Sequence, residues 1–174
     1  MERAKRLRWL GIDKGTWDRT DLKESYWWEY HVDEIGLKCN MNDIQAAIGL
    51  VQLRKLESMN KRRREIIKMY TEGLKDIDGI ETPPEDTKDC KSSWHIYCIR
   101  CDKRDDLSAY LENSGIGTGV HYKPIHTYPC YGNKPSLPVA ERVFIRILTL
   151  PLHPGLSDED VNRIIDTIKA FENL

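Results

Sequence analysis

Apolar residues recur every three or four positions from Asn42 to about Leu74, the period that places side chains on one face of a helix. Asn42 and Gln45 have the spacing of a capping box, in which each side chain accepts a hydrogen bond from the other residue's backbone amide. We therefore expect one long helix here. Its buried face is predicted to comprise Ile44, Ala47, Ile48, Val51, Leu56, Met59, Ile66, Met69 and Tyr70.

The rest of the pattern alternates short helices with short strands. Helices are expected at residues 2–10, 104–114, 137–146 and 157–171, and strands at residues 80–82, 93–101, 116–121 and 148–150. Ser157 is predicted to cap the last helix, and Gly117 and Gly119 allow close backbone approach in the strand 116–121. The buried stripe of the last helix is predicted to be Val161, Ile164, Ile165 and Ile168. This order indicates an α/β fold, a small sheet packed against helices.

Composition narrows the class of protein. The 174 residues are 40% hydrophobic and 32% charged with a net charge of −1, which is typical of a globular protein and excludes a general nucleic-acid binder. No apolar run is long enough to span a membrane, and we expect a cytoplasmic protein. The five scattered cysteines predict reduced thiols. Cys98 and Cys101 would point to opposite faces of a strand, so we expect no metal site.

Three stretches carry candidate chemistry. Lys38 precedes the helix that begins near Asn42, and a lysine beside free helix-terminal amides favours a phosphate or carboxylate; a solvated lysine before an ordinary capped helix is the alternative. The loop His121–Tyr131, rigid through its prolines, offers His, Tyr and Lys for polar ligand recognition; a loop with surface aromatics is the alternative. The aromatic-rich residues 12–34 predict either a packing surface or an arm over a ligand.

Four blocks of sequence in this order resemble the carboxyl-terminal portion of the DegT/DnrJ/EryC1/StrS family of sugar aminotransferases. They are GLKCNMNDIQAAIGLVQL (36–53), SWHIY (93–97), GVHYKPIH (119–126) and LPLHPGLS (150–157). The resemblance implies a fold of the aspartate-aminotransferase type and the cofactor pyridoxal 5′-phosphate (PLP). It also implies a nucleotide-linked keto-sugar as substrate, glutamate as the usual amino donor, and a homodimer with shared active sites.

The resemblance assigns roles to residues of this chain. Lys38 corresponds to a position that reaches the PLP phosphate of the neighbouring subunit, and Asn40 stands where many relatives have an arginine near the substrate. The loop that approaches the sugar nucleotide corresponds to His121, Tyr122, Lys123 and His126, with Lys123 facing its phosphates. Trp28 belongs to the segment 27–30, which resembles an arm that crosses toward the partner subunit.

The resemblance also implies what these residues lack. No lysine here stands in the family's PLP-lysine motif, so we expect no catalytic residue in the chain and no transamination by it alone. Residues 1–41 are expected to be the remnant of a large domain with an interface arm, and residues 42–174 the small domain with its bridging helix. Two alternatives stay open: a non-catalytic module that binds sugar nucleotides and dimerises, and a lysine-less sugar dehydratase of the same family.

Overall fold

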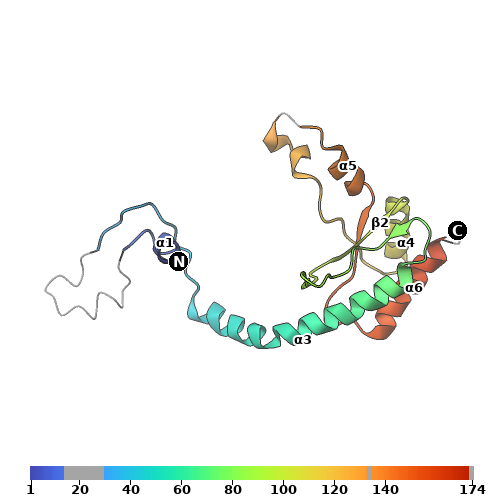
Figure 1. Ribbon diagram of the computed structural model, residues 1–174, viewed down its shortest axis with the longest axis horizontal. Helices are drawn as coiled ribbons and strands as arrows, with labels where there is room; N and C mark the ends of the chain where they lie inside the picture. The colour runs from blue at the N-terminus through green and yellow to red at the C-terminus, as the bar shows by residue number, and fades with distance from the viewer. Residues whose placement is uncertain (14–29, 133–134, 173–174) are drawn as a thin grey trace. The chain divides into compact units, whose positions relative to one another are not determined.

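The computed structural model describes residues 1–13, 30–132 and 135–172. The chain forms two compact units, Met1–Arg54 and Lys55–Leu174. The boundary between them falls inside the longest helix, α3 (Asp43–Leu74), which is labelled in Figure 1. Among the described residues, no helix is both long and apolar enough to cross a membrane.

In the first unit, a short helix is followed by a turn that brings residue 38 beside residue 9. Helix α1 (Glu2–Leu7) ends earlier than predicted, and the backbone turns at Gly11, whose φ of 80° suits a residue without a side chain. The returning chain then pairs with the end of α1. Its contacts are Leu37 N to Leu7 O at 2.7 Å and Cys39 N to Arg8 O at 2.9 Å, with an antiparallel bridge between Trp9 and Lys38.

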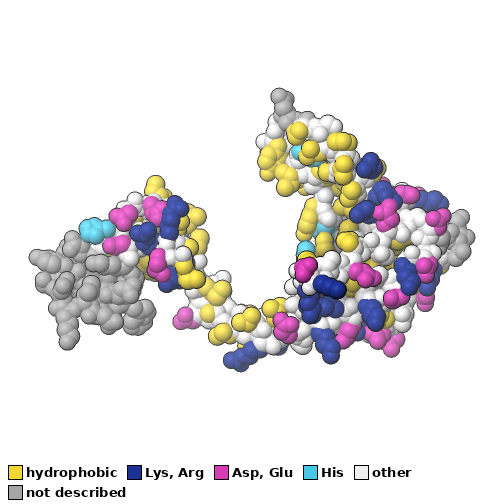
Figure 2. Space-filling view, viewed as in Figure 1, with side chains coloured by type: hydrophobic (Ala, Val, Ile, Leu, Met, Phe, Trp, Pro, Cys, Tyr) yellow, Lys and Arg dark blue, Asp and Glu magenta, His cyan; other side chains and the backbone are white. Residues whose placement is uncertain are grey.

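The predicted start of α3 is confirmed, because Asn42 Oδ1 accepts from Gln45 N at 2.9 Å and Gln45 Oε1 accepts from Asn42 N at 3.1 Å. The predicted burial of its first turns is wrong. Figure 2 shows hydrophobic side chains on the surface of these turns. They are exposed because the described part of the first unit has no sheet or second long helix to cover them. The exposed residues are Ile44, Ala47, Ile48, Val51 and Leu56.

The second unit is built on a three-stranded antiparallel sheet in the order β1-β2-β3. Its strands are β1 (Ile80–Glu81), β2 (Tyr97–Cys101) and β3 (Ile147–Leu150), with Tyr97 opposite Leu150 and Arg100 opposite Ile147. The predicted strand 116–121 is wrong. Its backbone pairs with β3 through a single bridge, between Gly119 and Thr149, instead of a ladder.

Three helices cover the sheet and close the core: α4 (Arg104–Asn113), α6 (Asp158–Glu172) and the later turns of α3. The helix α5 (Pro138–Phe144) has no buried residue and lies outside this core. Ser157 caps α6 as predicted, accepting from Asp160 N at 3.1 Å. The predicted stripe of α6 is buried, together with α3 residues from Ile66 onward. The core cluster includes Ile66, Tyr70, Leu74, Tyr97, Ile99, Leu107, Leu111, Leu148, Leu150, Val161, Ile165 and Ile168. The predicted α/β arrangement is confirmed.

Candidate functional site

His121 is held against the sheet by a glycine and a threonine. Gly119 and Thr149 exchange two backbone hydrogen bonds, of 3.1 and 2.7 Å, and Thr149 Oγ1 lies 3.0 Å from Nδ1 of His121. A side chain at Gly119 would place its Cβ 2.6 Å from Cε1 of His121, so the ring occupies space that only glycine leaves. The imidazole is thus packed on one side and hydrogen-bonded on the other.

The loop after His121 is folded into two tight turns. Pro124 precedes the 3-10 helix η1 (Ile125–Thr127), and Thr127 Oγ1 donates to Pro124 O at 2.7 Å. The second turn, η2 (Pro129–Tyr131), begins at a proline, where a missing amide costs no hydrogen bond. The expectation that prolines keep this loop out of α-helix agrees with both turns, although the loop has more regular structure than predicted.

His126 connects this loop to α5. Its Nε2 lies 3.0 Å from Oε1 of Glu141, and its side chain is only 10% exposed. Glu141 Oε1 also accepts from the backbone N of Leu137 at 3.1 Å, just before α5 begins. The hydrogen bond from His126, followed by that from Leu137, lowers the pKa of the Glu141 carboxyl below its ordinary value. A charged Glu141 therefore binds both the loop and the start of α5.

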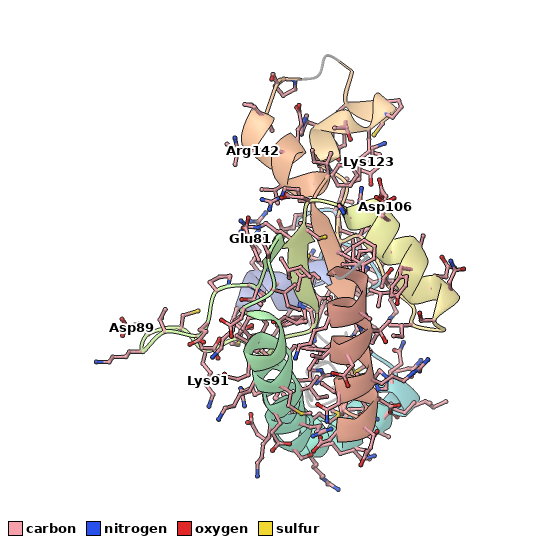
Figure 3. The ribbon with its side chains drawn as sticks, turned by 90° about the vertical axis from the view of Figure 1, so that its right-hand side faces the viewer. Glu81, Asp89, Lys91, Asp106, Lys123 and Arg142 are labelled. Carbon is pink, nitrogen blue, oxygen red and sulfur yellow. The ribbon has the colours of Figure 1, made fainter. Side chains whose placement is uncertain are left out.

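Two other predicted residues of the loop are exposed. Tyr122 is 69% exposed and meets the His121 ring edge-on at 4.8 Å between centroids. Lys123, labelled in Figure 3, has its Nζ 5.7 Å from the centroid of the Tyr128 ring. His121, Tyr122, Lys123 and His126 thus lie on one loop, where Tyr122 and Lys123 are exposed and each histidine is hydrogen-bonded to a side chain outside the loop. Figure 2 shows apolar side chains gathered over this loop and α5, among them the exposed Ile125, Tyr131 and Val139.

Lys38 stands close to the start of α3 in the first unit. Its Nζ lies 2.9 Å from the centroid of the Trp9 ring, and its side chain is exposed. Among the described residues it has no carboxylate partner, and the first turn of α3 keeps backbone amides that the capping box does not use. The ammonium group of Lys38 could therefore make one contact to a phosphate, such as that of PLP. The indole of Trp9 holds this ammonium group in place.

The remaining predicted residues are less informative. Asn40 is exposed beside Lys38 in sequence. Trp28 lies outside the described residues. The functions predicted for all of these residues stay predictions.

Three residues that hold the predicted site residues were not predicted from the sequence: Thr149, Glu141 and Trp9. Thr149 could have been noticed, since it is the one polar residue in the strand sequence ILTL of residues 147–150. Nothing in the sequence indicates the roles of Glu141 and Trp9, because their partners lie far away in the chain. Gly119 was predicted to allow a close approach and does so, whereas a Cβ at Gly117 would meet nothing within 4 Å.

Comparison with known proteins adds a family and solved relatives. The profile of the DegT/DnrJ/EryC1/StrS aminotransferase family matches residues 1–169. The spore coat polysaccharide biosynthesis protein SpsC of Bacillus subtilis is 36% identical over 183 residues, which cover 97% of this chain and 46% of SpsC. The dTDP-4-dehydro-2,3,6-trideoxy-D-glucose 4-aminotransferase of Saccharopolyspora spinosa is 36% identical over 174 residues, covering 98% of this chain and 45% of that enzyme.

Solved structures agree in fold. The aminotransferase TlmJ from Streptoalloteichus hindustanus is 38% identical, with a TM-score of 0.83 over 97% of this chain and 43% of that one. The PMP form of the sugar aminotransferase Spr1654 from Streptococcus pneumoniae, described as putative, is 33% identical, with a TM-score of 0.84 over 97% of this chain and 44% of that one. The chain thus spans about half the length of the relatives that it matches.

Proposed function

The chain belongs to the DegT/DnrJ/EryC1/StrS aminotransferase family, and on this premise we propose that it is the carboxyl-terminal part of a PLP-dependent enzyme acting on sugar nucleotides. The reaction is transfer of an amino group, with glutamate as donor, to a keto-sugar linked to a nucleotide. The observation that carries the proposal is the family match over residues 1–169. The Saccharopolyspora spinosa relative, named for a 4-aminotransferase acting on a dTDP-linked dehydro-sugar, supports this substrate class.

In this proposal Lys38 contributes one contact to the PLP phosphate, with Asn40 close by. The cofactor itself supplies the electron sink for the amino-group transfer. The exposed ammonium of Lys38 over Trp9 supports the assignment, since a lysine held in place loses less freedom when it binds an anion than a freely moving one. The arm that carries Trp28 completes the contact with substrate.

The loop 121–131 is proposed to bind the sugar nucleotide. Lys123 supplies a positive charge for the nucleotide phosphates, and the exposed ring of Tyr122 provides a surface for the sugar. His121 and His126 hold the loop in shape, since each already bonds a protein side chain. The second nitrogen of each ring is left to bind substrate.

We further propose a homodimer in the cytoplasm. In such a dimer Lys38 of one subunit serves the PLP of the other, as the resemblance implies. All five cysteines of the chain are unpaired thiols, including the exposed Cys39, Cys90 and Cys130, which supports a reducing compartment.

The first test concerns the Schiff-base lysine. We expect this chain, mixed with PLP and treated with borohydride, to gain no stoichiometric PLP mass, because the lysine of the family motif is not among its residues. A one-to-one adduct on a single lysine would overturn this part of the proposal. The coding sequence upstream of Met1 decides among the classes: an in-frame PLP-lysine selects the aminotransferase, a histidine there the dehydratase, and a start at Met1 the binding module.

A second test separates the two lysines in a complete enzyme that contains this chain. Lys38→Ala is expected to weaken PLP retention roughly ten- to a hundredfold, the effect of losing a charge-assisted hydrogen bond. Lys123→Ala should instead raise KM for the sugar nucleotide and leave PLP retention unchanged. Lys55→Ala, an exposed lysine of α3, is the control for both. Unchanged PLP retention in Lys38→Ala would remove Lys38 from the cofactor site.

A further inference from the structure

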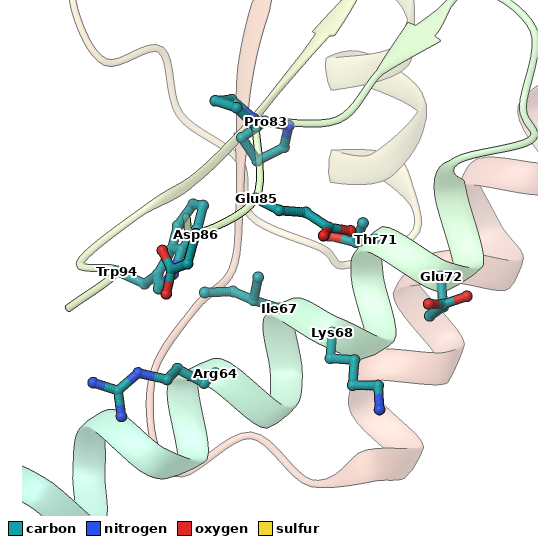
Figure 4. Close-up of a pocket in the computed structure, with 10 residues that line it drawn as sticks. Arg64, Ile67, Lys68, Thr71, Glu72, Pro83, Glu85, Asp86 and Trp94 are labelled. Carbon is teal, nitrogen blue, oxygen red and sulfur yellow. The ribbon is translucent and has the colours of Figure 1, made fainter. Parts of the chain in front are cut away.

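A cleft of about 320 Å³ lies between α3 and the segment that joins β1 to β2. None of its lining residues belongs to the loop 121–131 or to the Lys38 region. Figure 4 shows Arg64, Ile67 and Thr71 on α3 with Trp94 and Asp86 across from them, whereas the side chain of Lys68 points away from Trp94 and Asp86. Pro83, Pro84 and Glu85 complete the opposite wall.

The apolar wall of the cleft is held in a strained conformation. Trp94 has a φ of 47°, which is rare for a bulky residue, and its backbone N donates to Ser92 Oγ at 3.1 Å. The indole packs on the Tyr97 ring, at 6.5 Å between centroids, and Tyr97 in turn shares a hydrogen bond of 3.0 Å with Thr71. The wall is therefore fixed from behind, and one face of the indole borders the cleft.

Arg64 is the cation on the α3 side that is available to a ligand in the cleft. Among the described residues Arg64 forms no ion pair or hydrogen bond from its side chain, and its Nε is buried without a partner. A buried donor in this state gains from any acceptor that enters the cleft. An anionic group is therefore favoured at this side.

The opposite wall carries negative charge. Glu85 and Asp86 are exposed, and only Oδ1 of Asp86 is occupied, by the backbone N of Ser92 at 3.0 Å. The third carboxylate of the cleft, Glu72, is already paired with Lys75 at 2.8 Å. The cleft thus offers one positive side chain, Arg64, and two negative side chains, Glu85 and Asp86, beside the apolar Ile67 and Trp94.

From this arrangement we propose that the cleft binds a small zwitterion with an aromatic or apolar body, of the chemical class of the aromatic α-amino acids. The carboxylate of the ligand meets Arg64, its ammonium group meets Glu85 and Asp86, and its ring lies against Trp94. A simple anion would meet the two carboxylates, and a simple cation would meet Arg64, so each alone is disfavoured. The site is independent of the proposed aminotransferase function.

The test uses NMR of the full chain, with the indole N–H signal of Trp94 assigned through Trp94→Phe. L-phenylalanine is expected to shift this signal in a saturable way, with a Kd on the order of 1 mM for a ligand of this size. Phenylacetate, phenethylamine and glycine each lack one of the three features and should bind about tenfold more weakly or not at all. Equal affinity for phenylacetate or phenethylamine, or no saturable shift with L-phenylalanine, would overturn the proposal.

Variants connect the shift to the cleft. Arg64→Gln and Asp86→Asn should each weaken binding of L-phenylalanine about tenfold, since each removes one charge-assisted contact from the surface without emptying the core. Lys61→Gln is the control, because Lys61 is an exposed cation of the same helix but does not line the cleft. The affinity of this variant for L-phenylalanine should equal that of the unmodified chain. Unchanged binding in both cleft variants would place the ligand elsewhere and refute the assignment.

Discussion

Oγ1 of Thr149 lies 3.0 Å from Nδ1 of His121, although the two residues are 28 positions apart in the chain. Thr149 is buried at 7% exposure on β3, so the strand reaches out to the histidine through its one polar side chain. The contact occupies one ring nitrogen and leaves Nε2 without a partner among the described residues. It therefore determines which nitrogen a ligand of the loop meets.

Thr149→Val should release His121 while preserving the shape of the strand. The valine fills the same volume, and the loss of one hydrogen bond costs about 1 kcal/mol in the free energy of unfolding. We expect the ring nitrogens of His121 to change their NMR shifts toward those of an imidazole in water. Thr167→Val, at a hydroxyl that only bonds the carbonyl of Arg163 in α6, is the control. Unaltered His121 shifts in Thr149→Val would show that the hydroxyl does not govern the ring.

Gly119→Ala should displace the same ring by steric contact. The new Cβ would lie 2.6 Å from Cε1 of His121, so the imidazole has to move and its bond with Thr149 is lost. Gly117→Ala is a matched control, because a Cβ there meets nothing within 4 Å. Both changes reduce the freedom of the unfolded chain by the same amount, so their difference isolates the contact. His121 NMR shifts that are the same in both variants would contradict this explanation.

The different surroundings of Gly117 and Gly119 could not be predicted from the sequence. The start of α3 at Asn42 and the stripe of α6 were predictable, since capping and helical period are local properties. Gly117 and Gly119 look alike in the sequence, and only the position of the His121 ring separates them. The apolar residues in the first turns of α3 have the period of a buried face. Burial depends on what packs against a helix, however, and a periodic pattern contains no information about that.

Glu141→Gln should make the anchoring of the loop insensitive to pH. The pKa of Glu141 is lowered by the hydrogen bond from His126, and a carboxyl with a lowered pKa stabilises the fold above its ordinary value of 4.5. This stabilisation is lost as the pH falls through the lowered pKa. The melting temperature of the chain should therefore exceed that of Glu141→Gln at about pH 6, and the difference should shrink as the pH falls below the ordinary value of 4.5.

The control for this pH dependence is Glu112→Gln, an exposed carboxylate of α4. Its melting temperature should follow that of the unmodified chain at every pH, because Glu112 holds no loop. If Glu141→Gln showed a constant difference from pH 3 to 6, the charge of Glu141 would have no part in the anchoring, and packing of α5 alone would hold the loop.

Gly73 of α3 packs directly against Ile165 of α6. A Cβ at this position would lie 2.8 Å from both Cδ1 and Cγ2 of Ile165, a side chain that is 5% exposed. Ile165 belongs to the core cluster and has neighbours on the far side, so it has little room to retreat. Gly73→Ala is therefore expected to destabilise the Lys55–Leu174 unit by about 1–3 kcal/mol, the cost of overpacking a core, measured by urea denaturation.

Gly49 provides the matched control, because it lies in the same helix and a Cβ there meets no atom within 4 Å. Alanine favours helix over glycine by about 0.8–1 kcal/mol, so both variants gain the same intrinsic preference. Gly49→Ala should slow amide hydrogen exchange in the first turns of α3, whereas Gly73→Ala should lower the urea midpoint despite that gain. An unchanged or raised midpoint in Gly73→Ala would mean that α3 and α6 can separate slightly at no cost, and that the glycine is not required for their packing.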